Sequence, residues 1–490
     1  MDICRREFGA CILGAWAGRA LALPSRPKLL VLVLIEQLRP DNLDAAWPQF
    51  GPAGLRRVLE KGAYFPDCRH LASTFPATGV ATLATGAWPS QHGIVADSWY
   101  DRAARRPQRA SGEALLATTL AAQVAAEPRT RVAVVAMNQA HADLFARTTD
   151  AQIFWMDERG QFATRGEPPD WLENYNGAKG PESAHAARWM ALGARQDAAA
   201  LRILTFDPDR PEEFLALYKS SPFGMGAQYD FLGDLITRLH LGQGNTFDFV
   251  CVIDGSTGLL GYETGGHSPL MQQMVLQLDI RIGALLNQLK NAVGENGFNL
   301  VLAAAHGAPP EPAAETRDRM AVSGESVAQA VERSLSPAGS GHVEKYLYPF
   351  LYLDTSGFRD PEPVRIAAAR AALQHSAVAG YYTAGGACST RDEWERRFRN
   401  SFHPRRSGDV MLSYRAEYVE SFAAGRGVSY GSLYNYDTRV PLCFYGPQFQ
   451  TAVFESPVES VDVAPTLARA MGVAAPSSSV GRVLGEAFAE

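Results

Sequence analysis

Cysteine is scarce in this sequence. Only 6 of the 490 residues are cysteine and none are spaced as Cys-x-x-Cys, so no cysteine zinc cluster is expected. An excess of positive charge is also missing, because 46 Lys and Arg are outnumbered by 52 Asp and Glu, giving a net charge of −6 at pH 7. Without a basic stripe to neutralise phosphates, we expect no nucleic-acid partner.

The sequence has no long block of one charge, no low-complexity tract and no internal repeat. Its composition is that of a globular protein, with 46% hydrophobic residues, 10% aromatic residues, 44 Gly and 30 Pro. These values exclude disordered, coiled-coil and collagen-like chains. The length predicts either two to four domains or one large α/β enzyme fold with insertions.

The N-terminal segment has the pattern of an export signal. Arg5 and Arg6 precede an apolar stretch over residues 10–17, and residues 20–22 read Ala-Leu-Ala. We therefore expect residues 1–22 to be a signal peptide and the protein to be periplasmic or extracellular, with the arginine pair favouring the twin-arginine route. Arg19 leaves too short an apolar run for a stable membrane anchor.

Removal of this segment would leave four cysteines. They are Cys68, Cys251, Cys388 and Cys443. An oxidising compartment would allow one disulfide among them, but the sequence does not determine the pairing.

Five short runs of β-branched and apolar residues alternate with longer helical patterns. They cover residues 29–35, 131–136, 247–253, 299–305 and 440–444. The alternation predicts an α/β fold with a doubly wound, largely parallel sheet and helices on both faces. Glu36 follows the first run and His306 the fourth, and ligands in such sheets bind beyond the carboxyl ends of the strands.

Two segments interrupt the alternation. Residues 158–240 are mixed in composition, and residues 309–425 are rich in Pro, Ala, Arg and Ser. We expect an α/β core formed by residues 23–308 and 426–490, with an insertion at about 158–240. Residues 309–425 are predicted to form an inserted cap subdomain, which is a common place for specificity.

Several motifs, taken in order, resemble one protein family. They include KLLVLVLIEQLRPDNL, STFPATGVATLATGAWPSQHGIVADSWYDR, FVCVIDGSTGLLGYETG, LVLAAAHGAPPEP and GVSYGSLYNYDTRVPLCFYG. From about Lys28 to the C-terminus, the chain resembles secreted bacterial phosphatases of the alkaline phosphatase superfamily, in the type I phosphodiesterase and nucleotide pyrophosphatase branch. The resemblance implies an alkaline phosphatase-like fold, two bound zinc ions and a metal-bound Thr or Ser nucleophile.

The resemblance places unexpected residues at the nucleophile and at the first metal ligand. Pro76 stands at the nucleophile position and has no side-chain oxygen. Glu36 replaces an Asp ligand, and Asp97 replaces a phosphate-binding Asn, where it would repel phosphate. Residues 137–139 are neutral, although the family has two cations nearby.

The remaining ligand positions also differ from the family pattern. Gly258 and Tyr262 stand where one zinc would have an Asp and a His, and Ala305 replaces an Asp ligand of the other. The last His position falls on Tyr430, or on Arg439 if the alignment shifts to the next motif.

Only Glu36 and His306 keep metal-binding groups, and both belong to the same expected zinc. A zinc site normally has three or four protein ligands, so we predict no bound zinc or other cofactor. The sequence then indicates a catalytically inactive pseudophosphatase that binds a small anionic ligand or a protein partner, or serves as a scaffold.

The alternative is an active hydrolase of phosphate, phosphonate or sulfate esters with a rearranged metal site. Its candidate catalytic residues are Thr74, Thr78 and His306, and its candidate metal ligands are Glu36 and His306. Thr74 is included because the sequence TFPA resembles the nucleophile segment TFPN of eukaryotic nucleotide pyrophosphatases. A third possibility is a metal-independent transfer enzyme whose arginines hold an anionic substrate.

Overall fold

The computed structural model describes residues 27–148, 150–195, 197–309, 320–336, 342–390, 392–416, 418–420 and 430–490. The predicted signal peptide lies outside the described residues. Within them, no helix is both long and apolar enough to cross a membrane. All four cysteines expected in the mature chain are free thiols in the described structure.

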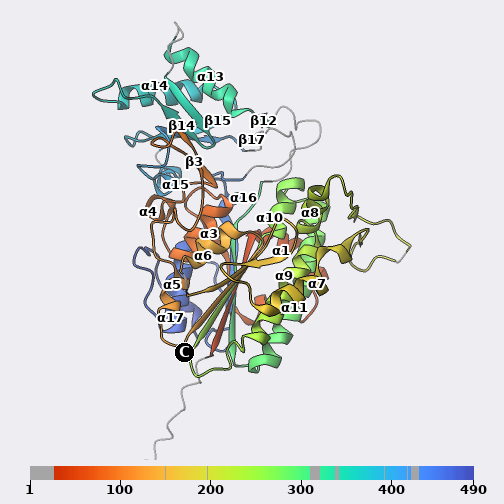
Figure 1. The fold of residues 1–490 in the computed structure, drawn as a ribbon. Coiled ribbons are helices and arrows are strands. Elements are labelled where there is room, and N and C mark those ends of the chain that lie inside the picture. Colours follow the sequence, from red (N-terminus) through yellow and green to blue (C-terminus); the bar gives the residue numbers. More distant parts are fainter. Residues whose placement is uncertain are drawn as a thin grey trace, which may run out of the picture.

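A ten-stranded sheet runs through the centre of the molecule (Figure 1). Its order is β19-β2-β18-β11-β1-β10-β5-β6-β7, with β20 paired to β2. Strands β1, β10, β11, β5 and β6 are parallel, whereas β18 is antiparallel to β11 and β2, and β7 is antiparallel to β6. The strands are β1 (Leu29–Gln37), β2 (Ala63–Arg69), β5 (Arg131–Ala136), β6 (Gln152–Met156), β7 (Phe162–Thr164), β10 (Asp248–Asp254), β11 (Phe298–His306), β18 (Arg439–Tyr445), β19 (Ala452–Val453) and β20 (Val458–Glu459).

The central strands are buried along their whole length. Every residue of β1, with sequence LLVLVLIEQ, is buried, and so is every residue of β11. Continuous apolar runs of this kind are typical of parallel strands covered by helices on both faces. Strands β1 and β11 also include the polar residues Glu36 and His306 at their carboxyl ends, which brings these side chains inside the protein.

Helices cover both faces of the sheet (Figure 1). One face has α3 (Pro76–Thr85), α5 (Leu120–Ala125), α6 (Gln139–Ala146) and α17 (Val463–Met471). The other has α1 (Pro40–Ala46), α9 (Pro222–Arg238), α10 (Ser256–Thr264) and α11 (Pro269–Val293), with α2 (Leu55–Lys61) beside α11. The predicted α/β class and doubly wound, largely parallel sheet are confirmed.

The segment predicted as an insertion at 158–240 contains several elements. They are β7, α7 (Asp170–Lys179), η2 (Pro181–Ala184), β8 (Arg188–Trp189), β9 (Arg202–Ile203), α8 (Pro211–Lys219) and α9. Helix α9 packs on β5 and β10 of the main sheet. The limits of the insertion stay a prediction.

A second, smaller sheet lies within the segment predicted as a cap (Figure 1). Its order is β13-β14-β16-β15, and all its pairs are antiparallel. The sheet and its helices α13 and α14 enclose their own apolar core. The elements are β13 (Val343–Leu347), β14 (Phe350–Leu353), β15 (Val378–Thr383), β16 (Val410–Tyr414), α13 (Gly324–Leu335) and α14 (Glu362–Leu373).

A hairpin formed by β3 (Ser98–Asp101) and β4 (Arg106–Arg109) contacts the smaller sheet. The Tyr100 amide donates to the Tyr352 hydroxyl at 3.1 Å, and Arg102 pairs with the buried Asp409, which also accepts from Arg365 at 2.8 Å. The remaining short elements are η1 (Trp47–Gln49), α4 (Pro89–His92), β12 (Ala321–Val322), α15 (Glu393–Ser401), β17 (Val419–Glu420), α16 (Asn435–Thr438), η3 (Ser460–Asp462) and η4 (Gly485–Ala487).

Candidate functional site

The carboxyl ends of β1, β10 and β11 bring the polar candidates together. Gln37 of β1 lies opposite His306 of β11, and Ile35 lies opposite Asp254 of β10. Glu36, Asp254 and His306 are all buried. The site therefore lies where ligands bind in parallel α/β sheets.

The Glu36 carboxylate is held by a histidine that the motifs did not identify. His141, in the first turn of α6, donates from Nδ1 to Glu36 Oε1 at 2.5 Å, and both side chains are largely buried. Asn138 begins α6 by accepting the His141 amide at 2.9 Å. Burial lowers the pKa of His141, but the charge of Glu36, its hydrogen bond to the ring and the charge of Asp97 together outweigh burial, so the pKa is raised. A raised pKa favours the protonated ring of His141, whose charge is opposite to that of the Glu36 carboxylate.

The glycines at the start of α10 make room for the longer Glu36 side chain. A Cβ on Gly258 would lie 2.7 Å from Glu36 Oε2, and one on Gly255 would lie 3.2 Å from Oε1. The Glu36 side chain thus borders the space that a ligand residue at position 258 would need. The changes at positions 36 and 258 are sterically coupled.

Pro76 and Asp97 meet at the N-terminus of α3. Pro76 is the first residue of this helix, and Asp97 Oδ1 accepts the amide of Ala77 at 3.0 Å. Burial raises the pKa of Asp97 to about 6. A helix N-terminus attracts anions, and here the chain's own carboxyl group binds the free amide.

Both threonine candidates are buried and donate to backbone carbonyls. Thr74 Oγ1 donates to Ser432 O at 3.2 Å, and Thr78 Oγ1 donates to Phe75 O at 2.8 Å. Among the described residues, no hydrogen bond connects either hydroxyl to Glu36 or His306. The structure does not bring these candidates into one hydrogen-bonded set.

His306 lies against two tyrosines. Its Nδ1 donates to Gly307 O at 2.6 Å, while its buried Nε2 has no partner within the described part of the chain. The Tyr430 ring centroid is 5.1 Å from that of His306 and 6.1 Å from that of Tyr262. Burial lowers the pKa of His306 to about 4, which keeps the imidazole neutral at pH 7.

Tyrosines also fill the boundary between the core and the smaller sheet. Tyr348, Tyr414, Tyr430 and Tyr436 surround a hollow of about 10 Å³. A space of that size holds about one water molecule. This hollow is too small for a phosphate ester.

The residues present do not fit the two-zinc centre that the resemblance implies. In the described ranges, no three His, Cys, Asp or Glu residues are grouped so that they could hold a metal ion. Glu36 is paired with His141, and Ala305, beside His306, has no donor side chain. We therefore derive no chemical step through a metal, and the expected absence of zinc stays a prediction.

Sequence reasoning missed His141 and Asp254. The signal for His141 was the buried face of α6, where residues 141, 142 and 145 follow the cap residue Asn138. Asp254 ends a buried strand and accepts the Ser256 amide at 3.0 Å, and burial raises its pKa to about 7. His141 lies outside the quoted family motifs, and Asp254 lies within FVCVIDGSTGLLGYETG but at neither of the ligand positions that the resemblance implies there.

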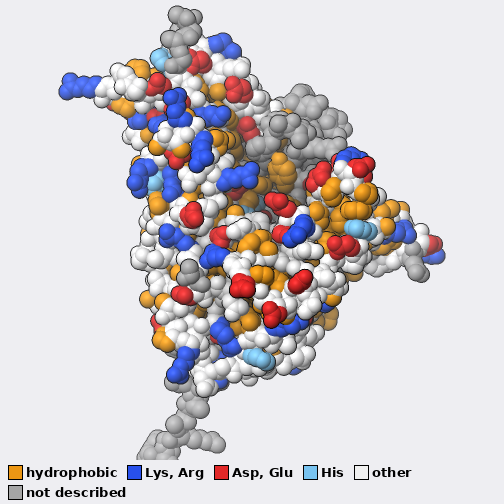
Figure 2. Space-filling model, viewed as in Figure 1, with side chains coloured by type: hydrophobic (Ala, Val, Ile, Leu, Met, Phe, Trp, Pro, Cys, Tyr) orange, Lys and Arg blue, Asp and Glu red, His pale blue; other side chains and the backbone are white. Residues whose placement is uncertain are grey.

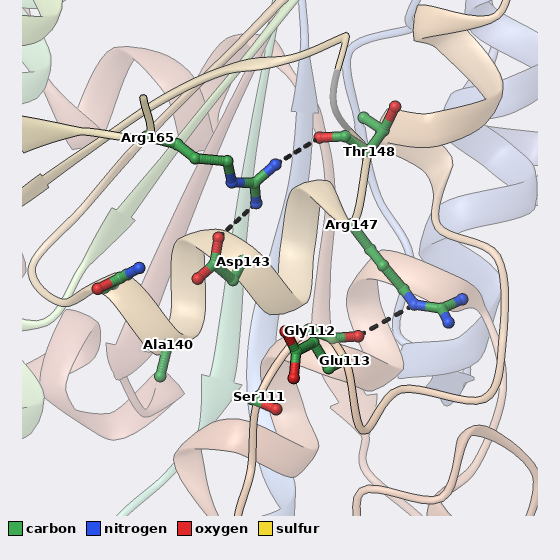
Figure 3. Close-up of a pocket in the computed structure, with 9 residues that line it drawn as sticks. Ser111, Gly112, Glu113, Ala140, Asp143, Arg147, Thr148 and Arg165 are labelled. Carbon is green, nitrogen blue, oxygen red and sulfur yellow. Dashed lines mark hydrogen bonds and ion pairs between the residues drawn. The ribbon is translucent and has the colours of Figure 1, made fainter. Parts of the chain in front are cut away.

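A large open hollow lies on the outer side of α6, away from Glu36. It has a volume of about 880 Å³, and Arg165 and Arg147 on its wall are already bonded, Arg165 to Asp143 and Arg147 to Gly112 O (Figure 3). The hollow contains none of the residues predicted for the site. Its lining residues are Ser111, Gly112, Glu113, Gln139, Ala140, Asp143, Arg147, Thr148 and Arg165.

Comparison with known proteins gives one consistent family. The model of the type I phosphodiesterase / nucleotide pyrophosphatase family matches residues 30–419. Alkaline phosphatase PhoV of Synechococcus elongatus is 24% identical over 516 residues, covering 94% of this chain and 92% of the relative. Alkaline phosphatase PafA of Elizabethkingia meningoseptica is 23% identical, with 96% of each chain covered. The crystal structure of wild-type PafA superposes with a TM-score of 0.84 over 96% of this chain and 100% of that one, at 21% identity.

Proposed function

The chain belongs to the type I phosphodiesterase / nucleotide pyrophosphatase family, and within that family we propose that it is an exported, catalytically silent phosphatase with a binding or scaffolding role. Its ligand is a small anion or a protein partner. Export is proposed from the signal-like pattern of residues 1–22.

One observation carries the proposal, namely the ion pair of Glu36 with His141. Glu36 is the last carboxylate at the ligand positions that the resemblance implies, and its partner at 2.5 Å is the buried ring of His141, whose pKa is raised. A metal ion would have to displace a buried, charge-assisted hydrogen bond to reach it. The metal would have to replace His141 as the partner of the buried carboxylate, which disfavours metal binding.

The position of the nucleophile supports the same proposal. Pro76 begins α3 and has no side-chain oxygen, so this position cannot attack a phosphorus atom. Asp97 binds the adjacent Ala77 amide, which would otherwise be available to a phosphate oxygen. His141 thus takes the place of a cation beside Glu36, and the Asp97 carboxyl group takes the place of a phosphate oxygen at the N-terminus of α3.

The test is hydrolysis of nitrophenyl phosphate and bis-nitrophenyl phosphate by the purified chain with excess zinc at neutral to alkaline pH. We expect rates no higher than those with zinc alone, because the metals and the nucleophile together supply several kcal/mol of barrier lowering and each 1.36 kcal/mol is about tenfold. Zinc-dependent turnover that is lost in both Glu36→Ala and His306→Ala would refute the proposal.

The alternative, an active hydrolase with a rearranged site, has one observation in its favour. The buried Nε2 of His306 has no partner among the described residues and could accept a proton or a metal bond. The same assay separates the two functions. An active site would lose turnover in His306→Ala. The control His92→Ala changes another buried histidine and should keep the turnover.

A further inference from the structure

A second hollow lies on the opposite face of the main sheet from α6. It has a volume of about 320 Å³ and lies between α7, η2, α8, α9 and α11. Pockets for small molecules begin at about 300 Å³. Its walls include Tyr175 and Lys179 of α7, Tyr218 of α8 and Arg281 of α11.

The floor of this hollow is one face of α9. Phe223, Gly226, Ala227 and Asp230 line it, and their spacing of three, four and seven residues places them on the same side of the helix. Ala227 has almost no side chain, which leaves the space above it open, whereas Gly226 is covered. A Cβ on Gly226 would lie 2.4 Å from an η-nitrogen of Arg281, so the guanidinium lies directly over this glycine.

Arg281 is incompletely paired. Its buried Nε has no hydrogen-bond partner within the described residues. Its closest carboxylate oxygen, on Asp230, is 3.6 Å from Nη1, which is an ion pair but too long for a hydrogen bond. The side chain is 29% exposed. A guanidinium in this state has donors left for an anion that enters the hollow.

The other walls provide flat apolar surface with polar tips. The rings of Tyr175 and Tyr218 are buried, and the Lys179 ammonium lies 5.8 Å from the Tyr175 ring centroid at the rim. Burial raises the pKa of Tyr218 to about 12, so its hydroxyl remains a donor at pH 7. Lys179 and Arg281 face a single carboxylate, Asp230, which leaves the lining with one excess positive charge.

We propose that this hollow binds a small organic monoanion, a carboxylate with a flat apolar body. The carboxylate binds the free donors of Arg281, and the body lies between the tyrosine rings and the Ala227 part of the floor. The site shares no residue with the Glu36 and His141 site, so the proposal does not depend on the loss of catalysis.

The test is binding of benzoate to the full chain, measured by ligand-observed NMR and calorimetry, with benzyl alcohol as the neutral probe. We expect saturable benzoate binding that weakens at least about tenfold in Arg281→Met, because a charge-assisted hydrogen bond is lost. Arg238→Met is the matched control. Arg238 is the last residue of α9, its ion pair with Asp234 is also 3.6 Å long, and it does not line the hollow.

A second variant tests the hollow itself without removing a charge. Ala227→Leu fills the floor of the hollow and should abolish benzoate binding while the melting temperature stays near that of the unaltered chain, because Ala227 is half-buried and borders open space. Absence of saturable benzoate binding, or equal affinities in the unaltered chain, Arg281→Met and Ala227→Leu, would overturn the proposal.

Discussion

Glu36 and His141 depend on each other for their stability inside the protein. Each charge has lost most of its water, and the hydrogen bond between them at 2.5 Å is the main compensation. The same hydrogen bond links α6 to the carboxyl end of β1. The pair is therefore both an electrostatic and a packing feature.

Removal of one member of the pair should be far more costly than removal of both. We expect His141→Ala to lower the free energy of unfolding by about 3–5 kcal/mol, because Glu36 is left buried and unpaired. The double variant Glu36→Ala with His141→Ala should reveal a coupling energy of about 1–3 kcal/mol. Urea denaturation measures all three values.

The control is the exposed pair of Asp41 and His267. These side chains are 48% and 47% exposed and 2.9 Å apart, so His267→Ala should change the free energy of unfolding by less than about 1 kcal/mol. The account of the buried pair would be wrong if His141→Ala were no more costly than His267→Ala.

The buried Asp254 predicts a specific pH dependence. Burial raises its pKa to about 7 from 3.8, so the folded state binds a proton more tightly than the unfolded state. Its contribution to stability is complete below about pH 4 and is lost as the pH rises through 7. Asp254→Asn keeps an acceptor for the Ser256 amide but does not titrate.

We therefore expect the stability of Asp254→Asn, relative to the unaltered chain, to increase steadily between pH 4 and pH 8. Urea unfolding at a series of pH values measures this difference, and Asp197→Asn, at an exposed position paired with Arg195, is the control. A difference that stayed constant with pH would show that Asp254 is ionised in the folded protein at low pH.

Single residues also explain why only part of the site could be predicted. Pro76, Gly258 and Tyr430 were predicted as site positions because family motifs place them in the sequence. His141 was not, because its role depends on a hydrogen bond from α6 to β1, between residues 105 positions apart. A contact of that kind has no local sequence signal.

At the scale of elements, the buried parallel strands were the most predictable. The run 131–136 coincides with β5, and the other four predicted runs agree with β1, β10, β11 and β18 within two residues at each end. Strand β2 was missed because its sequence AYFPDCR contains Pro and Asp, which disfavour strands, and it is only half-buried.

Helix α3 approaches β11 through a glycine. A Cβ on Gly79 would lie 2.0 Å from the carbonyl oxygen of Ala305, and backbone atoms cannot move aside easily. We expect Gly79→Ala to lower the free energy of unfolding by about 3 kcal/mol or more, because it forces α3 away from the sheet. Thermal and urea unfolding both measure this change.

Gly177→Ala in α7 is the matched control. Apart from its chain neighbours and the backbone of its own helix, nothing lies within 4 Å of the Cβ it would gain, and alanine favours a helix over glycine by about 0.5–1 kcal/mol. We therefore expect Gly177→Ala to be neutral or slightly stabilising. Equal effects of the two substitutions would contradict the close approach of α3 to Ala305.

At the scale of the whole molecule, the protein keeps the family's architecture. Its sheet and helices superpose on PafA with a TM-score of 0.84, and positive and negative side chains are intermixed over the face in Figure 2. A fold does not determine a function, which depends on the groups in its site. In our proposal, Glu36 and His141 neutralise each other inside the chain.

The most direct test is the zinc content of the purified chain, measured by atomic emission after incubation with excess zinc and removal of free ions. The account predicts well below one zinc ion per chain, with no change in Glu36→Ala or His306→Ala. About two tightly bound zinc ions per chain, as a catalytic centre of this family would hold, and their loss in these two variants would contradict it.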